Sequence, residues 1–337
     1  MRVIVFSILF SILLISGCGD SSNVPPGDSS NVTPITWTKQ NSSTTSALTA
    51  VTYGIGKFVA VGVGGTIQVS SDGVNWSSRN SGTTSQLYGI TNGGGLFVAV
   101  GEKGAILTSP DGDTWKNRAS GMAINQYTGE VSALSGIAYG NGQFVAFGGL
   151  RILLTSPDGI TWTSRNSDTN SYLYLLDVIF SGDQFIAVGA GGTILTSADG
   201  VNWTTRYSGQ PSTYALHISY GGGQFVAVGL GGTIVTSPDG MTWTNRTTDA
   251  SNNLSSIAYG NGQFVAVGGP NNPVFPAKSI FSSTLSATTS YGIILTSRDG
   301  INWVASLKSD TNGPFGWVTY GNGHFVVSAS DGTIVSD

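Results

Sequence analysis

The chain offers few side chains that could act as catalysts. Its 337 residues include one cysteine, two histidines and 18 acidic residues. Hydrolysis of glycosides usually needs two carboxylates at a fixed separation, and no two acids here are spaced in a way that indicates such a pair. A single cysteine excludes a disulfide framework and leaves too few ligands for a cysteine–histidine metal centre. We therefore expect no catalytic residue, metal ion or cofactor, although acids such as Asp177 and Asp183 stay open as candidates.

One third of the acids recur at the same place in a repeated motif, which indicates a structural role. The motif is Ser-x-Asp-Gly-x-x-Trp, and its aspartates are Asp72, Asp111, Asp158, Asp199, Asp239 and Asp299. An Asp side chain can bond the backbone ahead of it, and Gly adopts the left-handed conformation that a tight hairpin needs. We therefore predict that these aspartates form turns. The arginines three residues after each Trp are interpreted as packing and ion-pairing residues: Arg79, Arg118, Arg165, Arg206 and Arg246.

The composition excludes one class of partner and favours one class of fold. With 14 Lys and Arg residues, a net charge of −4 and no basic cluster, the chain cannot bind nucleic acid through counterion release. Only 9% of the residues are charged, against about 25% in typical domains. The 49 glycines, together with abundant Ser, Thr, Val and Ile, are typical of short strands joined by tight turns.

A repeat that occurs seven times predicts the architecture. The string Phe-Val-Ala-Val-Gly, or a near variant, starts at Phe58, Phe97, Phe144, Phe185, Phe225, Phe264 and Phe325. Seven repeats over residues 35–337 give about 43 residues each, the length of a four-stranded propeller blade. In the first repeat we predict strand A at Leu48–Tyr53, strand B at Phe58–Val61 and strand C at Thr66–Ser70, with Trp76 opening strand D. The fold class is therefore all-β, a seven-bladed β-propeller.

The ends of the repeated region predict how the ring closes. The last repeat stops at Asp337, before its Trp-bearing strand, and the missing strand stands at the beginning of the region as Ile35-Thr36-Trp37. We expect this N-terminal strand to complete blade 7 with three strands from the C-terminus. Such closure protects the sheet edges that an open array would expose.

The repeats resemble two known groups of propellers. Ser-x-Asp-Gly-x-x-Trp resembles the Asp-box of BNR-type propellers, one residue shorter between Asp and Gly. The segment from Gly191 to Trp203 is similar to repeats of the YCF48/HCF136-like photosystem II assembly-factor family. The resemblance implies a propeller and an assembly or binding role. Sialidases share such repeats, but their Phe/Tyr-Arg-Ile-Pro motif is absent, since Leu150-Arg151-Ile152-Leu153 lacks the proline.

The first residues are typical of an export signal. One arginine precedes an apolar run from Val3 to Ile15, which is too short for a transmembrane helix. The following Ile-Ser-Gly-Cys resembles the lipobox of bacterial lipoproteins, which implies cleavage before Cys18 and its lipidation. We therefore expect a signal peptide at 1–17, a lipidated cysteine with a flexible Gly/Ser/Pro-rich tether at 18–34, and the propeller at 35–337. The expected location is a membrane surface, the outer membrane if the host is Gram-negative.

One register position yields candidate binding residues. Immediately before the Val or Ile of each strand A stand Ala50, Gly89, Gly136, Asp177, His217, Ser256 and Trp317. Small residues suit a crowded channel wall, so Asp177, His217 and Trp317 are exceptional. Aromatic residues with a few polar groups are typical of binding sites, and further tyrosines lie in adjoining loops: Tyr172, Tyr174 and Tyr214. The alternative interpretation is that these side chains only fill the mouth of the channel.

Two insertions lie on the same expected face of the ring. They cover residues 121–133, between blades 2 and 3, and 269–290, within the B–C loop of blade 6. Loops on a rigid scaffold commonly carry binding, although neutral insertions are also tolerated there. We therefore expect a lipid-anchored scaffold that binds a protein partner through its B–C/D–A loop face and is not an enzyme. The alternatives are a glycan-binding, lectin-like propeller and a sialidase- or glycosidase-like enzyme.

Overall fold

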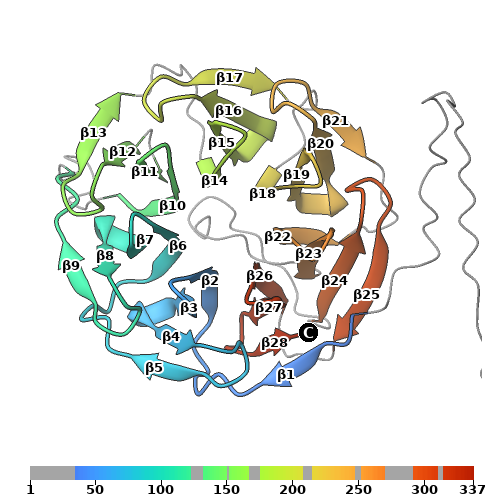
Figure 1. The fold of residues 1–337 in the computed structure, drawn as a ribbon, viewed down its shortest axis with the longest axis horizontal. Coiled ribbons are helices and arrows are strands. Elements are labelled where there is room, and N and C mark those ends of the chain that lie inside the picture. Colours follow the sequence, from blue (N-terminus) through green and yellow to red (C-terminus); the bar gives the residue numbers. More distant parts are fainter. Residues whose placement is uncertain are drawn as a thin grey trace, which may run out of the picture. The chain divides into compact units, whose positions relative to one another are not determined.

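The computed structural model describes residues 35–122, 132–149, 152–166, 175–207, 215–246, 252–269, 291–309 and 314–337. Within these ranges the chain forms seven four-stranded antiparallel sheets, arranged around an axis as the blades of a propeller (Figure 1). No helix in the same ranges is long and apolar enough to cross a membrane. The predicted seven-bladed propeller is therefore confirmed.

Two strands of each blade lie nearest the axis. The innermost, strand A, is β2 (Leu48–Gly54), β6 (Leu87–Gly93), β10 (Leu134–Gly140), β14 (Leu175–Ser181), β18 (Ala215–Gly221), β22 (Asn253–Gly260) and β26 (Phe315–Gly321). Strand B is β3 (Lys57–Gly62), β7 (Leu96–Gly101), β11 (Gln143–Gly148), β15 (Gln184–Gly189), β19 (Gln224–Gly229), β23 (Gln263–Gly269) and β27 (His324–Ala329). Each A–B pair forms a hairpin with regular antiparallel register from its turn inward.

The two outer strands complete each sheet. Strand C is β4 (Ile67–Ser70), β8 (Ile106–Ser109), β12 (Ile152–Ser156), β16 (Thr193–Ser197), β20 (Ile234–Ser237), β24 (Gly292–Ser297) and β28 (Ile334–Ser336). Strand D is β5 (Ser77–Arg79), β9 (Lys116–Arg118), β13 (Thr163–Asn166), β17 (Thr204–Tyr207), β21 (Thr244–Arg246), β25 (Val304–Ser309) and β1 (Thr38–Gln40). Short 3-10 turns join B to C at η2 (Val63–Gly65), η3 (Glu102–Gly104), η4 (Ala190–Gly192) and η5 (Leu230–Gly232).

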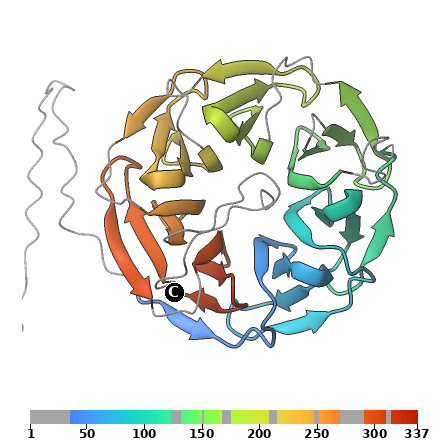
Figure 2. The same cartoon turned by 180° about the vertical axis from the view of Figure 1, so that it is seen from behind.

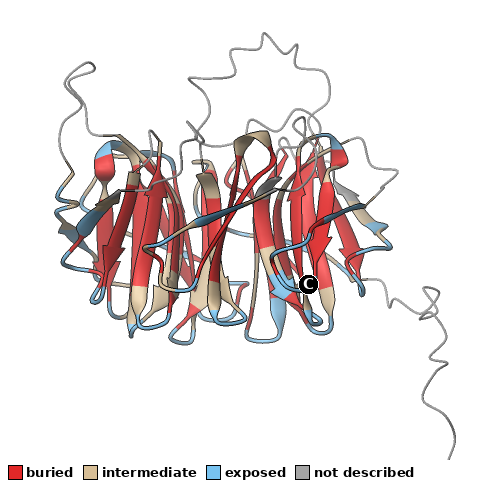
Figure 3. Cartoon of the chain, turned by 90° about the horizontal axis from the view of Figure 1, so that it is seen from above, coloured by how far each residue is buried: buried red, intermediate tan, exposed pale blue. Residues whose placement is uncertain are grey.

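The ring has two different edges. The A–B and C–D hairpins lie along one edge, which we call the hairpin face, and the D–A and B–C connections lie along the other, the loop face. Figure 3 shows exposed turns along the hairpin face, below strands that are buried in their middle. The A–B hairpins need two residues with positive φ, as at Asn141 (φ 47°) and Gly142 (φ 75°). That is the backbone of a type I′ turn, which explains the Asn-Gly and Gly-Gly pairs at these places.

The cores lie between neighbouring blades. Strand B is sandwiched on both sides, so the residues after its first are mostly apolar, and Phe58, Val59 and Ala60 are fully buried. The aromatic residue near the end of strand A packs against the Phe of its own strand B, as Tyr259 does edge-on against Phe264 with ring centroids 4.7 Å apart. Aromatic pairs of this kind stabilise by about 1 kcal/mol beyond the area they bury.

The same aromatic residues interlock adjacent blades at the hairpin face. The ring of Tyr320 in blade 7 lies directly over the Cα of Gly260 in blade 6, so that any Cβ at residue 260 would overlap the ring. The same contact joins other neighbours, at Gly93 with Tyr139 and at Gly321 with Tyr53. The repeated Tyr-Gly dipeptide of the sequence therefore serves contacts between blades. The Gly of one blade leaves room for the aromatic ring of the next.

The ring closes as the ends of the repeated region predict. β1 pairs with β28 in antiparallel register, with Lys39 opposite Val335, and the sheet order is β1-β28-β27-β26. Trp37 lies 6.4 Å from Phe325 between ring centroids. Figures 1 and 2 show β1 (blue) on the outside of the C-terminal strands (red). Blade 7 therefore joins the two ends of the repeated region in one sheet.

Candidate functional site

A cavity lies on the axis of the ring. Its volume is about 410 Å³, and all seven A strands contribute to its wall. In each strand the lining starts at the third residue or later and continues toward the A–B hairpin. Tyr220, near the end of β18, is 38% exposed, whereas Leu48, Leu87 and Leu134 at the beginnings of their strands are buried. Among the described residues, the cavity thus extends along the A strands from their third residue toward the hairpin face.

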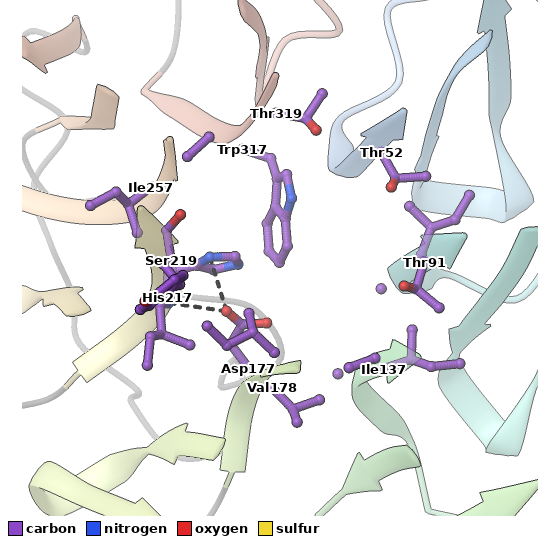
Figure 4. A pocket seen from close by; sticks show the side chains of 18 of the residues that line it. Thr52, Thr91, Ile137, Asp177, Val178, His217, Ser219, Ile257, Trp317 and Thr319 are labelled. Atoms are coloured by element: carbon purple, nitrogen blue, oxygen red, sulfur yellow. Dashed lines mark hydrogen bonds and ion pairs between the residues drawn. The ribbon is translucent and has the colours of Figure 1, made fainter. Parts of the chain in front are cut away.

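Three of the residues predicted from one register position meet in this cavity. Asp177 on β14, His217 on β18 and Trp317 on β26 come from blades 4, 5 and 7, and their side chains converge in Figure 4. The rings of His217 and Trp317 are nearly perpendicular, with centroids 3.8 Å apart. Trp317 also packs against the apolar clusters on both sides of blade 1. The indole therefore extends from blade 7 into the channel as far as His217 of blade 5.

Asp177 is a buried carboxylate without a cation beside it. Its Oδ2 accepts a hydrogen bond of 3.1 Å from the backbone N–H of Ile218 in the next blade. Burial raises the pKa of Asp177 to about 7, and the hydrogen bonds from the Ile218 and Val178 N–H groups offset only part of that rise. A carboxyl with such a pKa changes its charge near neutrality, so small changes in its surroundings alter the charge of the whole cavity.

His217 is the second buried titratable group. Its Nδ1 lies 3.1 Å from Asp177 Oδ2, which is within the distance of an ion pair. Neither ring nitrogen, however, makes a hydrogen bond of acceptable direction, and both are inaccessible to solvent. His217 and Asp177 are therefore close together without a hydrogen bond between them, because hydrogen bonds weaken steeply when misaligned. Burial lowers the pKa of His217 to about 3, so the ring is neutral at pH 7.

The other members of the register position have structural roles. Gly89 and Gly136 face the backbone of the next blade, where a Cβ would lie 3.2 Å from the carbonyl oxygens of Ser135 and Leu176 respectively. Ser256 accepts a hydrogen bond of 3.1 Å from the N–H of Val318. This bond is equivalent to the one between Ile218 and Asp177. At this position the side chains of Asp177 and Ser256 thus each accept a hydrogen bond from the backbone of the following blade.

Sequence reasoning missed a set of hydroxyl groups in the cavity wall. Two residues further along strand A than the candidate position stand Thr52, Thr91, Ser219 and Thr319, each half-buried and lining the cavity. Figure 4 shows them around the axis together with Asp177 and His217. These residues could have been predicted from the sequence, because alternate residues of a strand share a face. The wall is therefore more polar than its Val and Ile residues suggest.

Several predicted residues lie outside the described part of the chain. These are Cys18 and the loop tyrosines Tyr172, Tyr174 and Tyr214, and most of the insertions at 121–133 and 269–290 as well. The structure therefore assigns the candidate site from three residues of the strands alone. No group of three or more His, Cys, Asp or Glu within the described ranges is arranged to hold a metal ion.

The box aspartates lie in the C–D hairpins, far from the axial cavity. Oδ1 of Asp158 accepts the N–H groups of Ile160 (2.8 Å) and Thr161 (2.7 Å), and these bonds lower its pKa to about 2. Ser156 Oγ accepts the N–H of Gly159. The same pair of backbone bonds is made by Asp72, Asp111, Asp199, Asp239 and Asp299. Both bonds hold the hairpin loop together.

The repeated arginines lie on the outer strands. Nε of Arg165 donates to the hydroxyl of Thr155 on the adjacent strand C at 2.9 Å. Arg79 differs, because Val69 occupies the place of that threonine, and its Nε donates to Asp113 of blade 2 at 2.8 Å. The acid partner expected from the sequence is thus present for Arg79. A threonine hydroxyl takes that place for Arg118, Arg165, Arg206 and Arg246.

The chain was compared with known proteins. No protein-family model and no curated protein sequence matches it. Among solved structures, YCF48 bound to a D1 peptide is 16% identical, covers 91% of this chain and 97% of its own, and has a TM-score of 0.66. YCF48 from Cyanidioschyzon merolae is 16% identical over 89% of this chain and 98% of its own, with a TM-score of 0.65.

An enzyme has the same architecture. Virginiamycin B lyase from Staphylococcus aureus is 12% identical, covers 89% of this chain and 98% of its own, and has a TM-score of 0.69. Identities this low establish a shared fold and leave activity open, because one fold supports many functions. The comparisons therefore establish that this chain has the seven-bladed propeller fold that YCF48 and virginiamycin B lyase share.

Proposed function

We propose that the protein is an exported, lipid-anchored propeller that binds a protein partner through its loop face. The observation that carries this proposal is the distribution of connection lengths around the ring. Every A–B connection is a two-residue turn of the kind seen at Asn141 and Gly142, and six C–D connections carry the same box. Variation in length is concentrated on the opposite face, where binding loops on a rigid scaffold are expected.

The loop-face connections differ widely. β5 ends at Arg79 and β6 begins at Leu87, whereas β9 ends at Arg118 and β10 begins only at Leu134. The B–C connection of blade 5 needs only η5 (Leu230–Gly232), whereas β23 and β24 are separated by residues 270–291. The hairpin face is thus nearly the same in every blade, whereas the loop face differs from blade to blade.

A protein partner is favoured by a structural neighbour. The YCF48 structure was solved with a D1 peptide, so a propeller of this architecture can hold a polypeptide segment. Binding is favoured over glycoside hydrolysis, because Asp177 is the only carboxylate among the residues that line the axial cavity. A general acid and a general base cannot both be carboxylates there. Glycan binding is the second candidate, since the cavity wall carries hydroxyls and Trp317.

The proposed site of attachment is Cys18, followed by the tether at 18–34. Several acyl chains on one cysteine would hold the protein durably on a membrane, since each buried CH₂ contributes about 0.8 kcal/mol. In the native host, the wild-type chain is expected in the membrane fraction and the Cys18→Ser variant in the soluble extracytoplasmic fraction. Equal membrane retention of both variants would contradict the anchor.

Crosslinking in intact cells tests the partner. The wild-type chain is compared with a variant in which residues 270–291 are replaced by the short Leu230–Gly232 connection. A matched control, Met241→Ser, changes a side chain that is 54% exposed on the hairpin face. We expect a crosslinked protein for wild type and control, and its loss for the shortened variant. Retention by all three would reject the loop face. A hit on a glycan array without any crosslinked protein would favour the lectin-like alternative.

A further inference from the structure

The geometry points to a second site, independent of the loop face: the axial cavity binds an ammonium or guanidinium group, with Asp177 as its counter-ion and Trp317 as its aromatic wall. The cavity volume of about 410 Å³ lies within the range of small-molecule sites, about 300–1,000 Å³. It extends along the A strands toward the hairpin face, away from the beginnings of these strands at the loop face.

The charges of the lining select a cation. Lys and Arg are both missing from the residues that line the cavity, and Asp177 is the one carboxylate among them. Once Asp177 is ionised, nothing in this wall neutralises its charge, because His217 is neutral at pH 7. An anion would meet a carboxylate without any cationic side chain. A cation would pair with Asp177 in a site of low dielectric, where such attraction is strong.

The acceptors in the cavity wall favour a ligand that donates hydrogen bonds. The carboxylate of Asp177 and the hydroxyl of Ser219 both belong to residues that line the cavity. His217 lies beside them, but both of its ring nitrogens are inaccessible to solvent, so it shapes the wall without offering an acceptor. An ammonium group carries three donors and no acceptor. It therefore matches Asp177 and Ser219.

Aromatic rings line the path to these acceptors. Trp317 is half-buried beside His217, and Tyr139, Tyr220, Tyr259 and Tyr320 line the cavity near the hairpin face. A cation over an aromatic face gains about 0.5–2 kcal/mol, with Trp the most favourable ring. The tyrosines add aromatic residues to the wall between Asp177 and the hairpin face. The arrangement is thus a carboxylate at the end of an aromatic channel.

Binding is expected to strengthen as the pH rises through the pKa of Asp177. The titratable groups that face Asp177 from the packed strands are His217 and Tyr220 on β18 and Tyr139 on β10, and β15 has none. His217 stays neutral from about pH 4 upward. Between about pH 6 and pH 8, therefore, Asp177 changes its charge while His217 does not.

Calorimetric titration of the full chain in detergent tests the site. The free cations are cadaverine and agmatine, and an acetylated, amidated Gly-Gly-Lys-Gly-Gly peptide represents a side chain on a polypeptide. n-Butanol and butyrate are the neutral and anionic controls. We expect the cations to bind more tightly at pH 8 than at pH 6, and both controls to fail. Peptide binding equal to that of cadaverine assigns a protein segment as the source, and cadaverine alone assigns a free amine.

Variants separate the charge from the fold. Asp177→Asn is expected to weaken cadaverine binding about tenfold or more, since a carboxylate contributes more than 1.4 kcal/mol to a desolvated pair. Met241→Ser, on the hairpin face and outside the cavity lining, should bind as wild type does. If Asp177→Asn does not fold, Trp317→Leu takes its place, with the ¹⁵N shift of His217 on adding cadaverine as a further measurement. Equal affinity of Asp177→Asn, binding of butyrate or n-butanol, or no cation binding up to about 10 mM overturns the proposal.

Discussion

Asp177 and His217 form a pair that holds the same number of protons whether the chain is folded or not. In the unfolded chain their ordinary pKa values are 3.8 and 6.5, so between these values the carboxyl is ionised and the imidazole is protonated. In the folded protein the pKa values are about 7 and about 3, so the carboxyl is protonated and the imidazole is neutral. Between about pH 4 and pH 6.5 one proton is therefore bound in each state, and within this range the pair adds no pH dependence to stability.

Removing one member should expose the titration of the other. In His217→Gln, the remaining Asp177 binds more protons when folded than when unfolded. The free energy of unfolding should therefore fall as the pH rises from about 4 to about 7, by up to about 1.4 kcal/mol per pH unit. In Asp177→Asn the remaining His217 binds fewer protons when folded, so stability should rise from about pH 3 to about pH 6.5. Urea unfolding at several pH values measures both slopes.

The control for this experiment is Ser219→Ala, which changes a side chain of the same cavity that does not titrate. Its pH profile should parallel that of the wild type. Slopes of the same sign in the two single variants would show that burial does not control these pKa values.

At the scale of residues, the sequence predicted which side chains meet but not how. A single register position singles out Asp177, His217 and Trp317, because the repeat makes seven strands equivalent and small residues are the rule there. The contact between blades 5 and 7 could not be predicted, since it depends on how far the Trp317 indole reaches across the axis. The bond from Ile218 N–H to Asp177 depends on the offset between adjacent blades. The repeat length does not determine this offset.

At the scale of elements, the contact between glycine and aromatic ring sets the spacing of the blades. Ser181 stands where the other six A strands end in glycine. The next aromatic residue, Tyr220, is 38% exposed. A side chain at the glycine position keeps the following ring from lying flat on the strand. The Tyr-Gly dipeptide was visible in the sequence, but its partner in the next blade was not, because the contact is between repeats.

Gly260→Ala is expected to destabilise the protein by about 1–3 kcal/mol, as overpacking does, because the added methyl group overlaps the Tyr320 ring. The matched control is Gly316→Ala, on the following strand A, where a Cβ would lie 3.4 Å from the Leu48 carbonyl oxygen in ordinary contact. Free energies of unfolding from urea titrations give the comparison. An equal loss in the two variants would mean that backbone entropy, not the ring contact, selects glycine.

At the scale of the whole molecule, stability depends on one seam. β1 contributes three residues to blade 7 and pairs only with β28. The seam was predictable, because the missing strand of the last repeat stands at the start of the first. The hydroxyls of the axial wall, such as Thr91 and Thr319, were predictable too, because they stand two residues after the candidate position and alternate residues of a strand share a face.

A disulfide across the seam should stabilise the ring. Lys39 and Val335 are opposite each other in the β1–β28 ladder. The double variant Lys39→Cys/Val335→Cys, in a Cys18→Ser background so that no third thiol competes, would close a loop of nearly the whole ring. Chain-entropy estimates for long loops give about 4–5 kcal/mol. Thermal unfolding with and without reductant measures the gain, and Lys39→Cys alone is the control. If oxidation does not raise the melting temperature, the seam does not limit unfolding.

The seam also determines the order in which the ring can be completed. Among the described strands β1 is made before all the others and β28 after them, yet the two are neighbours in one sheet. Blades 1 to 6 each contain consecutive strands, so the strands of each can pair as soon as they are made. β1 pairs with none of these strands. The ring can therefore close through β1 only after β28 has been made.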